Sequence, residues 1–384
     1  MSLKRYRVGI MVIIFLFILD IMLPFILTYV SHHSSYGIKS NEIFENNFRF
    51  GEKVDKLVLD AFVYHIKKQD GYKVVFIGDS VIAGAMVKSN SDTIPAFFQA
   101  LASDKLSGKK IRVYNLAMPG NRPSDIYLTL KKLYASKAAN LIIMDINYAF
   151  YSNELLKENT IARPDNFFDV MEYDSAVKLG LKASFTENWI KNNILNKWNL
   201  YNMREELSFY LFGNNPREEL TSFDLINYKT IKEHPLYLPQ VDLKNNPDKI
   251  WIQNKPFSVS KISHWKNAFD IKEMNESNIS WWFLQRTNSI IKENNIRTAA
   301  FFTPVNSKLI EEYKLIPNIN LYNNNYKIMK DSLNNSDIRC FDYTNSIKSD
   351  YFCDLFHMAA AGNKQLALTI FKDVEKIIRE DIGQ

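Results

Sequence analysis

The distribution of apolar residues divides the chain into segments of different character. Residues 8–30 form an almost unbroken apolar run, and residues 31–70 are mostly polar with some helical periodicity. From residue 71 onward, short apolar runs alternate with amphipathic segments, and this alternation is interrupted between about 150 and 276. The pattern therefore predicts an N-terminal apolar helix, a linker, and an α/β domain over 71–384 that carries a long, mostly helical insertion.

The alternating part of the chain predicts a parallel sheet. Short apolar runs without polar alternation are typical of strands that are covered on both faces. Such strands are predicted over 73–77, 111–116, 141–146, 298–303 and 338–342. Helices are predicted over 93–106, 123–137, 278–294, 306–313, 322–334 and 358–380. This order of elements favours a doubly wound open sheet with helices on both faces.

The apolar run at 8–30 predicts a transmembrane signal anchor. It has 23 residues with Asp20 as its single charge, and about 20 apolar residues suffice to span a bilayer. Basic residues lie in the tail 1–7, which we expect to be cytoplasmic, and none lie in 31–37. The positive-inside rule then predicts a single-pass protein of the cell membrane with an extracytoplasmic domain. A cleaved signal peptide is the alternative, although the run is long for one and no A-x-A-like site follows.

Charge and composition exclude several classes of function. The chain has 48 basic and 42 acidic residues, giving a formal charge of +6 without any long run of like charges. This mild excess does not predict nucleic-acid binding. Cys340 and Cys353 are the only cysteines, so the sequence leaves open one disulfide or two free thiols. No ligand spacing is typical of a metal site, and neither metal nor cofactor is expected.

Polar residues recur where the predicted strands end. Gly78-Asp79-Ser80 follows the first strand, Gly120 lies in the loop after the second, and Asn147 follows the third. Asp354 and His357 lie between the last strand and the C-terminal helix. Each stretch alone is typical of an ordinary turn or helix cap. Because ligands bind outside the carboxyl ends of strands in open α/β sheets, their shared placement indicates one site.

These residue types predict acyl-transfer chemistry. A serine hydroxyl needs an adjacent base, which in turn needs an orienting group. We predict that Ser80 is the nucleophile, that His357 is the base, and that Asp354 orients the imidazole. The Ser80 and Gly120 backbone N–H groups and the Asn147 side-chain amide are the predicted oxyanion donors.

The same stretches resemble the conserved blocks of the SGNH, or GDSL-type, hydrolase superfamily. Gly78-Asp79-Ser80 is similar to its first block, and Asn115–Gly120 is similar to its glycine block. Residues 145–147 stand at the third block, and 354–367 resemble the final D-x-x-H block. The resemblance implies a flavodoxin-like three-layer fold and assigns the nucleophile, oxyanion and Asp–His roles to these positions.

The sequence also departs from that family and leaves the substrate open. Asp145 replaces the usual glycine of the third block, and Tyr148 replaces the acid that follows Asn147. The predicted anchor, its orientation and the resemblance together predict a membrane-tethered serine esterase or O-acyltransferase acting on acyl groups, expected to be O-acetyl, of a cell-surface glycan. A multi-span acyltransferase is its candidate partner. The alternatives are a lipid esterase of the same fold and a non-enzymatic envelope-assembly protein whose site has drifted.

Overall fold

The computed structural model of this chain describes part of its length. The described residues are 11–12, 14–22, 48–50, 56–106, 109–152, 173–179, 198, 251, 256–272 and 274–383. The chain divides into two compact units, the first formed by 1–43 with 171–234 and the second by 44–170 with 235–384.

The described part of the first unit is small. It contains helical residues within 11–22 and the short helix α8 (Tyr173–Lys178). Most of the predicted insertion and part of the predicted anchor at 8–30 lie outside the described residues. Within the described ranges, no helix combines the length and apolar composition that crossing a membrane requires.

The second unit is built on a five-stranded parallel sheet. Its strands are β1 (Tyr72–Ile77), β2 (Ile111–Asn115), β3 (Leu141–Ile146), β4 (Thr298–Phe302) and β5 (Arg339–Asp342). Their spatial order is β2-β1-β3-β4-β5, which is the flavodoxin-like order. The predicted α/β fold with a parallel sheet is therefore confirmed, and each predicted strand overlaps an observed one.

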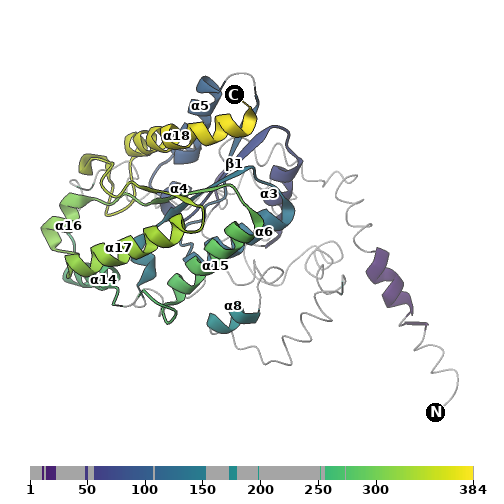
Figure 1. Cartoon of the computed structure of the whole chain (residues 1–384), viewed down its shortest axis with the longest axis horizontal. Coiled ribbons are helices and arrows are strands. Elements are labelled where there is room, and N and C mark those ends of the chain that lie inside the picture. The colour runs from purple at the N-terminus through teal and green to yellow at the C-terminus, as the bar shows by residue number, and fades with distance from the viewer. Residues whose placement is uncertain are drawn as a thin grey trace, which may run out of the picture. The chain divides into compact units, whose positions relative to one another are not determined.

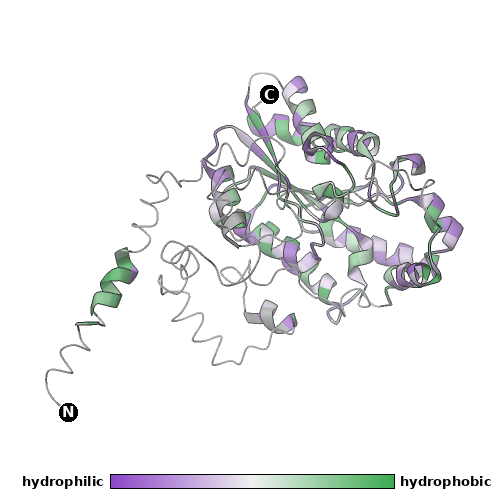
Figure 2. Cartoon of the chain, turned by 180° about the vertical axis from the view of Figure 1, so that it is seen from behind, coloured by the Kyte–Doolittle hydropathy of each residue, from purple (hydrophilic) through white to green (hydrophobic). Residues whose placement is uncertain are grey.

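Helices cover both faces of this sheet (Figure 1). On one face α5 (Ile94–Lys105) packs against α18 (Ala360–Ile382). The other face carries α6 (Pro123–Ser136), α15 (Ile279–Asn294) and α17 (Ile319–Asn334). Hydrophobic residues gather on the strands and on the inner sides of these helices (Figure 2). The result is the three-layer arrangement that the sequence predicts.

Aromatic contacts join the sheet to its helices. Phe76 of β1 lies 5.2 Å from Phe98 of α5, whose ring is 5.4 Å from Phe371 of α18, measured between centroids. On the opposite face, Tyr127 of α6 and Phe283 of α15 are 5.7 Å apart. All of these side chains are buried. Their large apolar surfaces stabilise the layers, and the strand ends are thereby held in fixed positions.

Part of the segment predicted as a linker belongs to the domain. Helix α3 (Lys56–Lys68) buries Leu59, Phe62 and Ile66, which recur at helical spacing along one face, and it packs against α6. The domain therefore begins before residue 71.

The two cysteines are free. Cys340 lies on β5, where burial raises the pKa of its thiol to about 12. Cys353 is fully buried beside the predicted catalytic segment. The alternative of a disulfide, which the sequence left open, is therefore not realised.

Candidate active site

Ser80 is presented by a sharp strand-to-helix turn. Strand β1 runs into Gly78 and Asp79, and the short helix α4 (Ser80–Ala83) begins at the serine. The Asp79 side chain accepts a hydrogen bond from the Val81 N–H at 2.7 Å and so caps this helix. A Cβ atom at Gly78 would lie 2.2 Å from the Asp145 carboxyl oxygen, so only glycine fits there. The turn places the Ser80 hydroxyl at the carboxyl end of β1.

A buried arginine supports the segment after α4. The guanidinium of Arg49 donates to the carbonyl oxygens of Gly84, Val87 and Lys88 at 2.7, 3.0 and 3.2 Å. It also donates to the Asn90 side chain at 2.6 Å. Burial lowers its pKa to about 10, so the group stays charged at neutral pH. Sequence reasoning missed Arg49 because it lies in a polar stretch without any motif.

We expect Arg49→Met to lower the free energy of unfolding by about 2 kcal/mol or more, because buried carbonyl oxygens would lose their donors. Arg112→Met is the matched control, since Arg112 pairs with the exposed Asp70 at 3.0 Å and such surface pairs contribute about 1 kcal/mol or less. Chemical denaturation of both variants measures the difference. Equal losses in the two variants would contradict a supporting role for Arg49.

A tight loop shapes the segment that carries the predicted acid and base. An isolated antiparallel bridge between Phe352 and Met358 closes the loop. Inside it, the Asp354 carboxylate accepts the backbone N–H groups of Phe356 and His357 at 2.9 and 2.8 Å. These bonds fix the carboxylate relative to the histidine backbone, so the acid and the base form one rigid unit.

The structure brings Ser80, His357 and Asp354 together. The His357 Nδ1 atom lies 2.8 Å from Asp354 Oδ2, and its Nε2 atom lies 2.7 Å from Ser80 Oγ, although serine and histidine are 277 positions apart. The side chains of His357 and Asp354 are 23% and 30% exposed, so the group is open to a ligand. This is the geometry of a Ser–His–Asp triad.

The electrostatics of the pair match this geometry. Burial lowers the pKa of His357, but the adjacent Asp354 carboxylate raises it more, and the net pKa lies above the ordinary value of 6.5. Burial raises the pKa of Asp354, while His357 and the two backbone N–H groups lower it to about 2. Asp354 is therefore ionised at neutral pH, and it favours the tautomer in which Nδ1 carries the proton and Nε2 accepts from Ser80.

Asn147 is oriented by Asp79. Its Nδ2 atom donates to Asp79 Oδ2 at 2.9 Å, and its Oδ1 atom accepts from the Ala149 N–H at 3.3 Å. The side chain is 6% exposed. The amide predicted as an oxyanion donor is thus held beside the residue that precedes Ser80. Asp79 is part of the GDS motif, but its role as the partner of Asn147 was not predicted.

The loop that carries Gly120 is attached to the same turn. The Met118 N–H donates to the Gly78 carbonyl oxygen at 3.2 Å, and the buried Asn121 side chain donates to that oxygen at 2.9 Å. Gly120 itself has a φ of +79°, a conformation that favours glycine. The loop predicted to supply an oxyanion donor therefore lies against the turn that presents Ser80.

Tyr148 belongs to the packing behind the site. Its ring lies 4.6 Å from that of Tyr322 in α17 and 6.3 Å from that of Phe269 in α14 (Val259–Phe269). Its hydroxyl accepts a hydrogen bond from the Asn325 side chain at 3.3 Å. The residue that departs from the family pattern therefore anchors α14, which lies within the predicted insertion.

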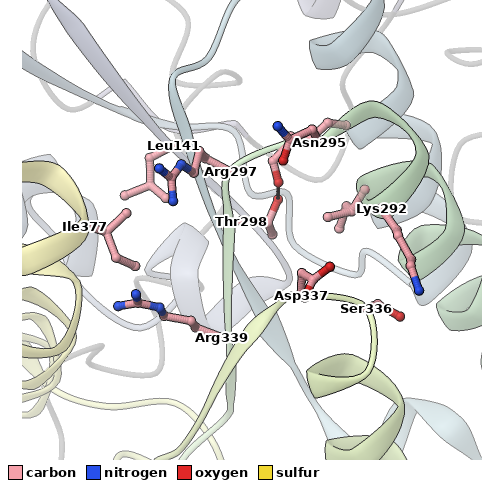
Figure 3. Close-up of a pocket in the computed structure, with 11 residues that line it drawn as sticks. Leu141, Lys292, Asn295, Arg297, Thr298, Ser336, Asp337, Arg339 and Ile377 are labelled. Atoms are coloured by element: carbon pink, nitrogen blue, oxygen red, sulfur yellow. Dashed lines mark hydrogen bonds between the residues drawn. The ribbon is translucent and has the colours of Figure 1, made fainter. Parts of the chain in front are cut away.

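A separate cavity lies at the amino ends of the strands (Figure 3). It measures about 150 Å³, and its lining includes Leu141, Thr298 and Arg339, the first residues of β3, β4 and β5. The cavity therefore lies at the opposite end of the strands from Ser80 and His357, which lie at the carboxyl ends. It is not part of the triad site.

Among known proteins, the chain is similar only distantly to several solved structures. No family model and no curated protein matches the sequence. Solved structures do match. An acetyl xylan esterase aligns over 79% of this chain and 99% of its own at 12% identity, with a TM-score of 0.36. A carbohydrate acetylesterase family member from Sinorhizobium meliloti aligns over 82% and 100% at 12% identity, with a TM-score of 0.29.

A third solved structure is a Bacteroides fragilis protein provisionally assigned as an acylhydrolase. It aligns over 85% of this chain and 100% of its own at 9% identity, with a TM-score of 0.37. Likenesses at these identities and TM-scores carry no argument, so the fold is taken from the sheet topology and the chemistry is inferred from the triad geometry.

Proposed function

We propose that this chain is a serine esterase or O-acyltransferase of the SGNH type. The observation that carries the proposal is the continuous hydrogen-bonded line from Asp354 through His357 to Ser80, at 2.8 and 2.7 Å. A serine activated in this way is equipped to attack an ester carbonyl.

The reaction proceeds through an acyl-enzyme. Ser80 Oγ bonds to the ester carbonyl carbon while His357 Nε2 takes its proton. The carbonyl π electrons move to oxygen and form a tetrahedral oxyanion. When this intermediate collapses, the bond to the leaving alkoxy group breaks, and His357 returns the proton to that oxygen. Water or an acceptor hydroxyl then attacks the acyl-serine by the same sequence in reverse, and Ser80 is regenerated.

The oxyanion is stabilised by donors from three strand ends. We assign this role to the Ser80 and Gly120 backbone N–H groups and to the Asn147 side-chain amide. The hydrogen bonds from Asn147 to Asp79 and from the Gly120 loop to Gly78 support this assignment. Donors that are fixed before the charge develops stabilise the transition state without reorganisation.

The proposed substrate is an O-acyl, chiefly O-acetyl, group on a cell-surface glycan. The apolar run at 8–30 and the basic tail before it support a tethered, extracytoplasmic domain. The resemblance to SGNH hydrolases supports ester chemistry and a multi-span acyltransferase as partner. Hydrolysis and transfer use the same serine chemistry and differ only in the acceptor.

One labelling experiment tests both the chemistry and the location. A charged fluorophosphonate that does not cross membranes is added to whole cells that express the full chain. We expect covalent labelling of the wild type and none of Ser80→Ala, because only an activated serine hydroxyl attacks the probe. Labelling that appears only after lysis would contradict the extracytoplasmic location. Folded wild-type protein that is never labelled would contradict the proposed chemistry.

A further inference from the structure

A second buried carboxyl group lies directly behind the nucleophile turn. Asp145, near the carboxyl end of β3, is 2% exposed. Its Oδ1 atom lies 3.3 Å from the backbone N–H of Asp79, and its carboxyl group occupies the space that a side chain at Gly78 would need. Among the residues that the structure describes, no donor reaches the buried Oδ2 atom. The proposed reaction gives this carboxyl group no role.

Asp79, which is 1% exposed, already uses both carboxylate oxygens as acceptors. Oδ1 accepts from the Val81 N–H at 2.7 Å, and Oδ2 accepts from Asn147 Nδ2 at 2.9 Å. The Asp145 carboxyl group lies against the same turn, where its Oδ1 accepts from the Asp79 backbone N–H at 3.3 Å, and it interacts with the Asp79 charge. Two neighbouring buried carboxylates would repel each other, whereas a single proton shared between them would allow a hydrogen bond.

We propose that Asp145 is a positioning residue: it keeps its proton and donates it to the Asp79 carboxylate, which in turn aims the Asn147 amide and holds the turn that carries Ser80. This inference deepens the proposed function and rests on it. Asp145 acts through Asp79 and does not touch the substrate. Its place in the third block, where SGNH hydrolases usually have glycine, makes the arrangement a feature of this chain.

The surroundings of Asp145 favour the protonated acid. Burial, followed by the Asp79 charge, raises its pKa well above the ordinary value of 3.8. Asp79 faces it from the turn after β1, and Tyr151 faces it from η2 (Tyr148–Tyr151). Burial and the Asp145 charge likewise raise the pKa of Tyr151, so this neighbour is neutral. The Asp79 charge also acts on His357, where it contributes to the raised pKa of the imidazole.

The proposed hydrogen bond predicts that activity declines at alkaline pH. Because the pKa of Asp145 is raised, the acid form persists through neutral pH and is lost only at alkaline pH. Ionisation would then place a second negative charge beside Asp79 and break the hydrogen bond that holds it. We expect kcat to fall at alkaline pH for this reason.

Two substitutions at Asp145 distinguish the loss of its hydrogen-bond donor from the loss of its ability to ionise. Asp145→Asn keeps the shape and an N–H donor but cannot ionise, so we expect near wild-type kcat at neutral pH and loss of the alkaline decline. Asp145→Ala removes the donor, and we expect kcat to fall about tenfold with KM unchanged. Asp381→Asn is the matched control, because Asp381 is also a hydrogen-bonded acid, bound to the Tyr72 hydroxyl at 2.6 Å.

The full chain is assayed on an activated ester across pH, with thermal unfolding measured in parallel. The inference is overturned if Asp145→Ala keeps wild-type kcat, if Asp145→Asn is as impaired as Asp145→Ala, or if the alkaline decline survives in Asp145→Asn.

Difference infrared spectroscopy adds a measurement that does not depend on turnover. We expect a carboxylic-acid C=O band at neutral pH that Asp145→Asn removes and Asp381→Asn retains. Absence of that band refutes the protonated acid even if Ser80 proves to be the nucleophile, whereas its presence without esterase activity would refute only the proposed function.

Discussion

Ser80→Ala is expected to abolish turnover of an activated ester such as p-nitrophenyl acetate while the fold stays intact. The Ser80 hydroxyl is the group proposed to form the acyl intermediate, and it lies 2.7 Å from His357 Nε2 at a partly exposed position. Loss of a triad nucleophile lowers kcat by roughly 10⁵- to 10⁶-fold. Ser103→Ala, on the exposed side of α5, is the matched control and should keep full activity.

The triad should also behave as a unit. We expect Ser80→Ala/His357→Ala to be little worse than Ser80→Ala alone, because the base has no function once its nucleophile is absent. Steady-state kinetics and far-ultraviolet circular dichroism of the purified variants test both statements. If Ser80→Ala retains wild-type turnover on every ester tried, Gly78-Asp79-Ser80 is an ordinary turn.

Asp354→Asn is expected to lower kcat by about 10³- to 10⁴-fold, because the amide no longer fixes the imidazole tautomer or stabilises the imidazolium. The pH profile should move as well. The carboxylate raises the pKa of His357, so its removal lowers that pKa, and the base becomes neutral at lower pH. The acidic limb of kcat/KM should therefore shift to lower pH while its plateau falls.

Asp350→Asn is the matched control for this profile, because Asp350 is an exposed acid that pairs with Lys308 at 3.0 Å. Measurement of kcat/KM from acidic to neutral pH compares the two variants with the wild type. An acidic limb that stays in place in Asp354→Asn would show that this carboxylate does not raise the pKa of His357.

Because the pKa of Asp354 is about 2 against an ordinary 3.8, its contribution to the free energy of unfolding should be present above about pH 4 and lost as the pH falls toward 2.

The sheet could be predicted because each of its strands is a short apolar run between polar turns. Residues 141–146 are such a run, and β3 occupies Leu141–Ile146. A strand that is buried on both faces has apolar residues at every position, and such a continuous run is readily recognised as a strand. The proximity of Ser80 and His357 followed from topology, since the carboxyl ends of parallel strands meet at one edge.

Features that depend on side-chain direction could not be predicted. Nothing in the sequence shows that Tyr148 packs against Tyr322 rather than beside the substrate. Likewise, Arg49 donates to backbone carbonyl groups, which leave no trace in residue identity. Asp145 was recognised as unusual, but its contact with Asp79 depends on how closely the ends of β1 and β3 approach.

The separation of Ser80 and His357 by 277 positions in sequence has a consequence for biosynthesis. A chain emerges from the ribosome N-terminus first, so the nucleophile turn is made long before the loop that carries its base. Until β5 and that loop join the sheet, Ser80 lacks the imidazole and is an ordinary, unreactive serine. We therefore expect the growing chain to be unreactive toward esters until the whole domain has folded.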